Sequence, residues 1–178
     1  MTFETKRLIL RPWEESDAPA LYKYASDPDV GPSAGWAVHK DVEDSLNIIR
    51  TVLSAEGTFA VIVKENGGEA VGSIGFFQTD VNDLREIELG YWIGKSFWGR
   101  GYIPEAMDRL MEYLFEERGE SRLWCAHFDF NERSRRVIEK CSFRYELSKV
   151  TEWPAVGTRH LTHYYSLCKA EWRSKKQK

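Results

Sequence analysis

The sequence predicts an α+β fold in which a mixed, mostly antiparallel sheet of seven strands is combined with four helices. Strand-like segments outnumber helical ones, tight turns join several strands directly, and single helices separate the others. The predicted order is a strand, two helices, three strands, a helix, a strand, a helix and two strands. Because no repeat or linker interrupts the 178 residues, we expect residues 1–178 to form a single domain.

The first quarter of the chain predicts a strand and two helices. Residues 5–11 alternate in polarity and end at Pro12, which is typical of a strand. A helix should begin at Ser16, and residues 30–38, rich in glycine and proline, predict a loop. A second amphipathic helix is expected over residues 40–54.

Three consecutive strands follow as an antiparallel meander. The strand patterns cover residues 58–64, 70–79 and 86–93. Asn66-Gly67-Gly68 and Asn82-Asp83 provide the residues that tight turns favour.

The last part of the chain predicts two helices and three strands. A helix begins near residue 102 and has one apolar face, formed by Ile103, Ala106, Met107, Leu110, Met111 and Leu114. Residues 123–128 predict a strand parallel to 86–93, since one helix separates the two. Residues 131–140 predict a short helix, and 143–150 with 160–167 predict a closing antiparallel pair.

Charge and composition exclude several classes of function. A net charge of −3 argues against a nucleic-acid surface, and no apolar run reaches the ~18 residues of a membrane span. Cys125, Cys141 and Cys168 are far apart, which argues against a disulfide framework or zinc site and favours the cytoplasm. The basic tail, residues 169–178, is expected to be a frayed end.

A glycine-rich turn at Gly99–Gly101 predicts an anion site. Glycine lets the backbone approach a ligand, and the helix that follows presents unpaired N–H groups and the positive end of its dipole. Residues 90–96 resemble a nucleotide P-loop, but one residue is missing between the glycines. Phosphate is therefore the expected ligand group, and nucleotide binding is the weaker alternative.

Three segments resemble the GNAT N-acetyltransferase superfamily. Residues 86–106 resemble its acetyl-coenzyme A motif, 131–143 resemble its N-x-x-S-x-x-v-x-E-K-x-G-F segment, and 5–13 resemble the start of its RimJ/RimL-like branch, the ribosomal-protein alanine N-acetyltransferases. The resemblance implies the GNAT fold, with helices on both faces and a splayed parallel strand pair. It also implies transfer of acetyl from acetyl-coenzyme A to a primary amine, with no metal.

The resemblance also implies roles for individual residues. The coenzyme should be bound by Gly90, Tyr91, Trp92, Ile93, Trp98, Gly99, Arg100, Gly101, Tyr102, Ile103, Asn131 and Ser134. Glu88 is the expected general base, and Ser134 is a candidate donor to the departing sulfur. Trp36, His39 and Glu86 are expected to line the acceptor pocket, although Glu86 and Glu88 could also form an ordinary solvated strand face.

Several alternatives remain open. Ile138 stands where some superfamily members carry a tyrosine acid, and Ile103 and Ser142 depart from the family pattern, which would suit a coenzyme-binding protein without activity. The acceptor could be a protein N-terminus, a polyamine or an antibiotic amine. Cys125 and His127 share a strand face, but a covalent cysteine route is not favoured. Exposed aromatic side chains would suit a homodimer.

Overall fold

Eight strands form one sheet in the computed structural model, which describes residues 1–81, 84–153 and 157–176. Their order across the sheet is β1-β2-β3-β4-β5-β6-β8-β7. The strands are β1 (Phe3–Glu4), β2 (Leu8–Arg11), β3 (Thr58–Val63), β4 (Ala70–Val81), β5 (Leu84–Ile93), β6 (Arg122–Phe128), β7 (Arg144–Trp153) and β8 (Thr158–Cys168). The predicted strand over residues 5–11 corresponds to β2, and the eighth strand is β1, which precedes it and forms a small hairpin with it, in which Phe3 pairs with Leu10. The turn predicted at Asn82-Asp83 lies outside the described residues.

One parallel strand pair interrupts the otherwise antiparallel sheet. Strands β5 and β6 pair through only three positions, the last of which joins Leu89 to Cys125. Beyond it, residues 90–93 pair with β4 on one side, and their other edge has no described pairing with β6. The expected splayed parallel pair is therefore confirmed, and it leaves a gap in the middle of the sheet.

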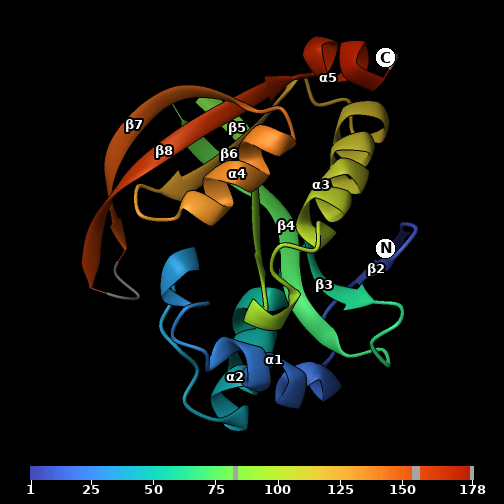
Figure 1. Cartoon of the computed structure of the whole chain (residues 1–178), viewed down its shortest axis with the longest axis vertical. Coiled ribbons are helices and arrows are strands. Elements are labelled where there is room, and N and C mark those ends of the chain that lie inside the picture. Colours follow the sequence, from blue (N-terminus) through green and yellow to red (C-terminus); the bar gives the residue numbers. More distant parts are fainter. Residues whose placement is uncertain (82–83, 154–156, 177–178) are drawn as a thin grey trace.

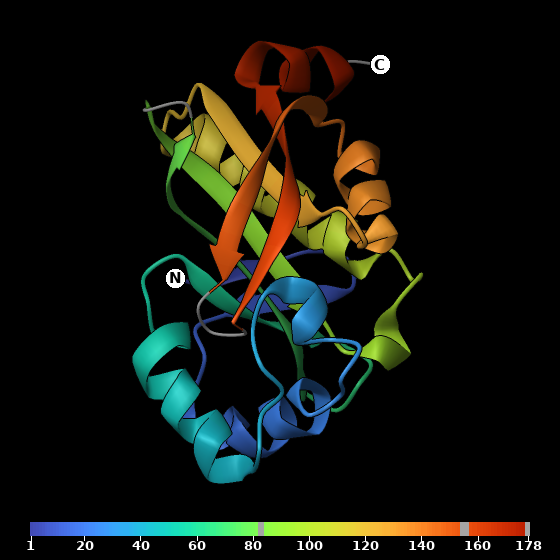
Figure 2. The ribbon, with the colours of Figure 1, turned by 90° about the vertical axis from the view of Figure 1, so that its left-hand side faces the viewer.

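Helices cover both faces of the sheet (Figures 1 and 2). They are α1 (Ala18–Ala25), α2 (Val42–Ile48), α3 (Tyr102–Glu112), α4 (Glu132–Lys140) and α5 (Lys169–Lys176). Strand β3 shows how alternation builds two cores: Val61 and Val63 pack with the apolar stripe of α3, whereas Ala60 and Ile62 pack with α1. The second predicted helix starts at α2 and continues as a π-helical turn, Ile49–Leu53.

The C-terminal tail is a helix, so the expectation of a frayed end was wrong for residues 169–176. Trp172 is 6% exposed and packs against Phe115, with ring centroids 5.2 Å apart. The Arg173 guanidinium adds two hydrogen bonds, of 2.9 and 2.7 Å, to the Glu116 carboxylate. Burial of Trp172 and the pairing of Arg173 with Glu116 together hold this helix against the body of the protein.

A backbone constraint precedes the last strand pair. Among the described residues, Ser142 is the only non-glycine residue with positive φ, at 75°. The glycine expected at this position from the family pattern would adopt that conformation without strain. Serine therefore keeps the turn at some cost in stability.

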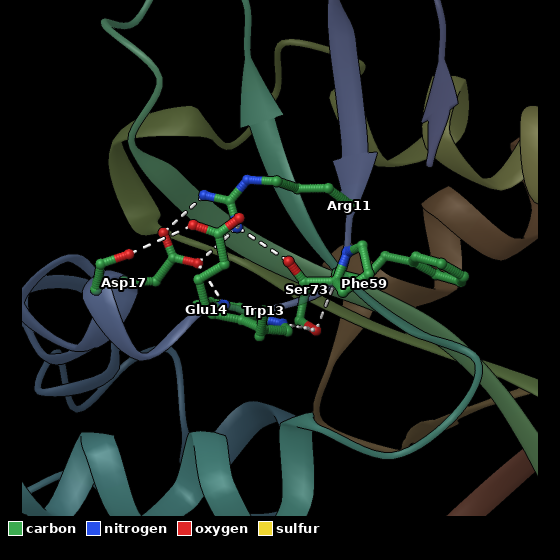
Figure 3. Close-up of polar contacts among 8 residues, drawn as sticks. Arg11, Trp13, Glu14, Asp17, Phe59 and Ser73 are labelled. Carbon is green, nitrogen blue, oxygen red and sulfur yellow. Dashed lines mark hydrogen bonds and ion pairs between the residues drawn. The ribbon is translucent and has the colours of Figure 1, made fainter. Parts of the chain in front are cut away.

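Polar contacts fix the end of β2 against α1 and the sheet (Figure 3). The Arg11 guanidinium forms two 2.7 Å hydrogen bonds with the Asp17 carboxylate, which also accepts one from the Glu14 amide at 3.0 Å. The Trp13 indole N–H donates to the Ser73 hydroxyl at 3.1 Å. Asp17 is only 7% exposed, so these donors take the place of water around its carboxylate.

We expect Asp17→Ala to lower the free energy of unfolding by about 2–4 kcal/mol, because it leaves the Arg11 guanidinium partly buried without its carboxylate. Urea unfolding measures this change. Glu15→Ala is the control, because it removes the exposed Glu15–Arg50 ion pair from the same region and should leave the midpoint nearly unchanged. Equal losses in the two variants would contradict the importance of burial at Asp17.

Candidate active site

A cavity of about 690 Å³ opens where β5 and β6 separate. Its walls come from β4, β5, β6, the end of β7, β8, the turn before α3, the start of α3, helix α4 and the loop before α2. Glu88 and Tyr91 both line it, although alternation directs their side chains to opposite faces of β5. The cavity therefore connects the two faces of the sheet through the gap between the parallel strands.

The predicted anion turn forms one end of this cavity. Gly99 and Gly101 have φ of 74° and 75°, a region that favours glycine, and Gly101 is the residue immediately before α3. The side chain of Trp98 is held by an indole N–H bond of 2.9 Å to the Ile93 carbonyl. The first N–H groups of α3 have no partner within the helix and can bind an anion.

Arg7, which is distant in sequence from the glycine turn at Gly99–Gly101, stabilises that turn through hydrogen bonds. Its guanidinium donates to the carbonyls of Arg100 and Gly101 at 2.9 and 3.2 Å, and to the Glu105 carboxylate at 2.6 Å. The Glu105 carboxylate in turn accepts from the Arg7 amide at 2.9 Å, which ties the first turn of α3 to the N-terminal segment. Arg7 thus satisfies the carbonyls of the turn, while the turn's amides are left for a ligand.

Three cations of α4 face the same end of the cavity. Arg133, Arg136 and Lys140 all line it, at a spacing that places them on one side of the helix. The Arg133 guanidinium lies over the Trp98 indole, 3.9 Å from the ring centroid. These three residues were not predicted from the sequence, although their helical spacing was a signal that could have found them. The glycine turn, the N-terminus of α3 and these three cations together form a site that could bind a group with several phosphates.

Glu88 lies at the other side of the gap. It faces the cavity, and the Thr79 side chain hydrogen-bonds to its carboxylate. Burial raises the pKa of Glu88 to about 7, because removing the carboxylate from water disfavours its charged form. Glu86 shares the strand face with Glu88, as expected, but it does not contribute to the cavity wall.

Two hydroxyl groups meet inside the cavity on the face opposite Glu88. The Tyr91 hydroxyl, on β5, lies 2.8 Å from the Ser134 hydroxyl, on α4, and 3.2 Å from the Ser134 carbonyl. Burial raises the pKa of Tyr91 well above its ordinary value, so its phenol keeps its proton. The pair links the two sides of the gap and places a hydroxyl donor between them.

Asn131 caps α4 and connects it to the loop before α2. Its side-chain oxygen accepts from the Ser134 amide at 3.1 Å, and its NH₂ group donates to the Ser33 carbonyl at 2.9 Å. Capping, the structural role expected for an asparagine at this position, is thus present. Asn131 also lines the cavity.

The expected coenzyme residues nearly all contribute to the cavity. Those in its wall are Gly90, Tyr91, Trp92, Ile93, Trp98, Gly99, Gly101, Tyr102, Ile103, Asn131 and Ser134. Arg100 is absent from this wall, and its backbone carbonyl instead binds Arg7.

Trp36 and His39 lie in the packing beside the cavity and not in its described wall. The Trp36 ring packs edge-on against Trp92 at 5.6 Å, and the His39 Nδ1 atom lies 2.8 Å from the Ser45 hydroxyl. Burial lowers the pKa of His39, which favours the neutral ring. From the same loop, Ser33 and nearby small residues reach the cavity instead.

Other potential reactive groups are inert or absent in the described part of the chain. Cys125 is fully buried, and burial raises its pKa well above the usual value, which disfavours the thiolate a nucleophile needs. Over residues 1–81, 84–153 and 157–176, no group of three or more His, Cys, Asp and Glu side chains is placed to hold a metal. None of the described helices is long and apolar enough to cross a membrane.

Comparisons with known proteins identify the family. The profile of the acetyltransferase (GNAT) domain matches residues 7–144. The chain is 32% identical over 176 residues to "Uncharacterized N-acetyltransferase p20" of Bacillus licheniformis, covering 96% of this chain and 98% of that one. It is 38% identical over 110 residues to "Putative ribosomal N-acetyltransferase YdaF" of Bacillus subtilis, covering 61% and 59% of the two chains.

Solved structures agree with this result. A GNAT-family acetyltransferase from Bacillus anthracis superposes with a TM-score of 0.82 at 27% identity, covering 96% of this chain and all of that one. The protein belongs to the GNAT acetyltransferase family and is an acetyl-coenzyme A-dependent N-acetyltransferase.

Proposed function

We propose that this protein acetylates a primary amine by direct transfer, with Glu88 as the base that accepts the amine proton. The observation that carries the proposal is a carboxylate whose pKa is raised to about 7, set in the cavity wall beside the gap between β5 and β6. A base whose pKa is near the working pH is ionised in a substantial fraction of the molecules and can still hold the proton that it accepts. Bound acetyl-coenzyme A supplies the acetyl group as a thioester.

The cavity offers groups that fit each part of the coenzyme. The amides after Gly99 and the cations Arg133, Arg136 and Lys140 would hold its phosphates. The edge of residues 90–93 that faces the gap would pair with the pantetheine amides, as an added strand does. A backbone N–H of the same edge would stabilise the oxyanion.

Ser134 is proposed to donate a hydrogen bond to the departing sulfur, with Tyr91 orienting its hydroxyl. We expect Ser134→Ala to lower kcat about 10-fold, because a hydrogen bond to developing charge is lost. Tyr91→Phe keeps the ring and removes only the hydroxyl. It should lower kcat in the wild-type background and have little effect when Ser134 is already alanine.

Steady-state kinetics on the two single variants and the double variant test this coupling, with KM for acetyl-coenzyme A measured alongside kcat. Independent, additive losses would contradict an orienting role for Tyr91. A change confined to KM would assign the hydroxyl pair to binding alone.

The proposed acceptor is the N-terminal amine of a protein, in the manner of the RimJ/RimL-like branch. The name of YdaF, which refers to ribosomal N-acetylation, supports this choice. Polyamine or antibiotic acetylation, and coenzyme binding without activity, are the competing functions. We also propose a cytoplasmic location, which the three free cysteines support, and a homodimer, which the exposed Phe130 and Tyr145 side chains would suit.

Two measurements separate these functions. Thermal shift with coenzyme A or Mg-ATP tests the ligand, and stabilisation by coenzyme A alone is expected. Thiol release from acetyl-coenzyme A is then followed with N-terminal peptides, polyamines and antibiotic amines. Stabilisation without turnover of any acceptor would favour the inactive coenzyme-binding protein, and stabilisation by Mg-ATP alone would contradict the proposed ligand.

A further inference from the structure

The cavity wall next to Glu88 is formed largely by aromatic rings and other apolar side-chain groups. Phe77 is the cross-strand partner of Glu88 in the β4–β5 ladder, so the two side chains share one face of the sheet. The Thr79 side chain bonds to Glu88, and Tyr164 is close enough for the Glu88 charge to contribute to its raised pKa, after the larger effect of burial. All three neighbours line the cavity.

Where β7 and β8 pair beside the cavity, the polar side chains are already hydrogen-bonded to one another. The Trp153 indole N–H donates to the Thr151 hydroxyl at 2.8 Å, and the same hydroxyl lies 2.5 Å from that of Thr162. The Phe128 and Trp153 rings meet edge-on, with centroids 4.9 Å apart. This part of the wall therefore presents mainly ring and methyl carbon to a ligand.

The loop before α2 closes against this aromatic wall. Gly35 has φ of 89°, and a Cβ added there would lie 2.7 Å from the Trp153 ring. The last part of β7 and the first part of β8 lie beside the turn at Pro32–Ala34 in both ribbon views (Figures 1 and 2). Ala34, beside that contact, adds another small apolar side chain to the cavity.

Charge in the cavity is distributed unequally. Among the described lining residues, Glu88 is the only carboxylate, and the remaining charged ones are Arg133, Arg136 and Lys140. One carboxylate can balance one ammonium. A second ammonium inside the cavity would find no further carboxylate among the described lining residues.

We infer that the acceptor is an amine with a single positive charge, attached to a carbon that carries an apolar group. The inference depends on the proposed function and narrows its acceptor. Two sources share this chemistry: a protein N-terminus whose first side chain is apolar, and a small free monoamine. Polyamines and multiply charged antibiotic amines do not share it.

Matched acceptors test the inference. Pentylamine and 1,5-diaminopentane have the same chain length and differ in one ammonium, and two peptides that differ only in N-terminal Leu or Lys repeat the comparison. We expect kcat/KM to favour pentylamine and the Leu peptide by about tenfold each. The better of these two substrates identifies the source. Equal or higher kcat/KM for the diamine or the Lys peptide would overturn the inference and leave the proposed function standing.

A substitution in the wall tests the role of charge. Phe77 is 51% exposed, so Phe77→Glu can add a second carboxylate beside Glu88 without disturbing the core. It should raise the kcat/KM ratio of diamine to monoamine about fivefold, while the uncharged Phe77→Gln should not. An equal change in both variants would overturn the role of charge. Absence of turnover with every acceptor, in a protein that coenzyme A still stabilises, would contradict the proposed function itself.

Discussion

Glu88→Gln is expected to lower kcat by about 100- to 1,000-fold at pH 7, which lies within the range that general-base catalysis supplies. The amide has nearly the shape of the carboxylate but cannot accept the proton that the amine must lose. Coenzyme binding should be retained, because the anion turn and the α4 cations lie at the other end of the cavity. Thiol release gives kcat, and titration calorimetry with coenzyme A gives the affinity.

The pH dependence gives this prediction a second readout. Wild-type kcat should rise with pH until Glu88 has ionised, with a midpoint at about 7. In the Glu88→Gln variant, kcat should no longer rise with pH in this range. Glu86→Gln is the matched control, since Glu86 lies on the same strand face but not in the cavity wall. In this variant, kcat should still rise with pH as in the wild type. A wild-type rate or profile in the Glu88→Gln variant would remove Glu88 from the mechanism.

The raised pKa of Glu88 also predicts an effect on stability. The folded protein holds the proton more tightly than the unfolded chain, so stability falls as the pH rises from the ordinary value of 4.5 to about 7. Glu88→Gln removes this ionisable group. The change that it causes in the free energy of unfolding should therefore be more favourable at pH 8 than at pH 4, by at most ~3 kcal/mol. A Tm difference between variant and wild type that does not change with pH would contradict burial as the cause of the raised pKa.

Local patterns were sufficient to predict most of the elements and the glycine turn at one end of the cavity. The apolar stripe from Ile103 to Leu114 belongs to one helix, and the turn at Gly99–Gly101 lies directly before it. Alternation along β5 also placed Glu88 on a face away from Ile87 and Leu89, which are buried. These features depend on residues that are close together in the chain. They can therefore be predicted from the periodicity of the apolar residues and from the residues that turns favour.

The cavity wall near Glu88 could not be predicted in the same way. Its wall brings together Phe77 from β4, Phe128 from β6 and Tyr164 from β8, which meet only through strand order. Trp36 was a reasonable candidate from its place in a loop, but a large ring next to Trp92 gains more from packing than from exposure in a cavity. Arg7 is likewise distant in sequence from the turn that it braces.

Gly101→Val should weaken coenzyme A binding about 100-fold, because the turn needs a conformation that valine adopts only with strain. At φ of 75°, a β-branched residue costs about 1–3 kcal/mol, and the backbone can relieve that strain by rotating the amides at the start of α3 away from the ligand. The carbonyl held by Arg7 would move with them. The N-terminus of the helix would then no longer present its donors to a phosphate.

Gly119→Val separates this effect from general destabilisation. Gly119 has nearly the same φ, 77°, and an added Cβ there meets no atom within 4 Å, but it lies after the α3 region and outside the cavity wall. Both variants should therefore lose similar amounts of Tm in the absence of ligand, while only Gly101→Val should lose coenzyme affinity and the thermal shift that coenzyme A produces. Equal Kd values for the two variants would show that the turn does not bind the phosphates, since backbone strain is the same in both and only the position of the amides differs.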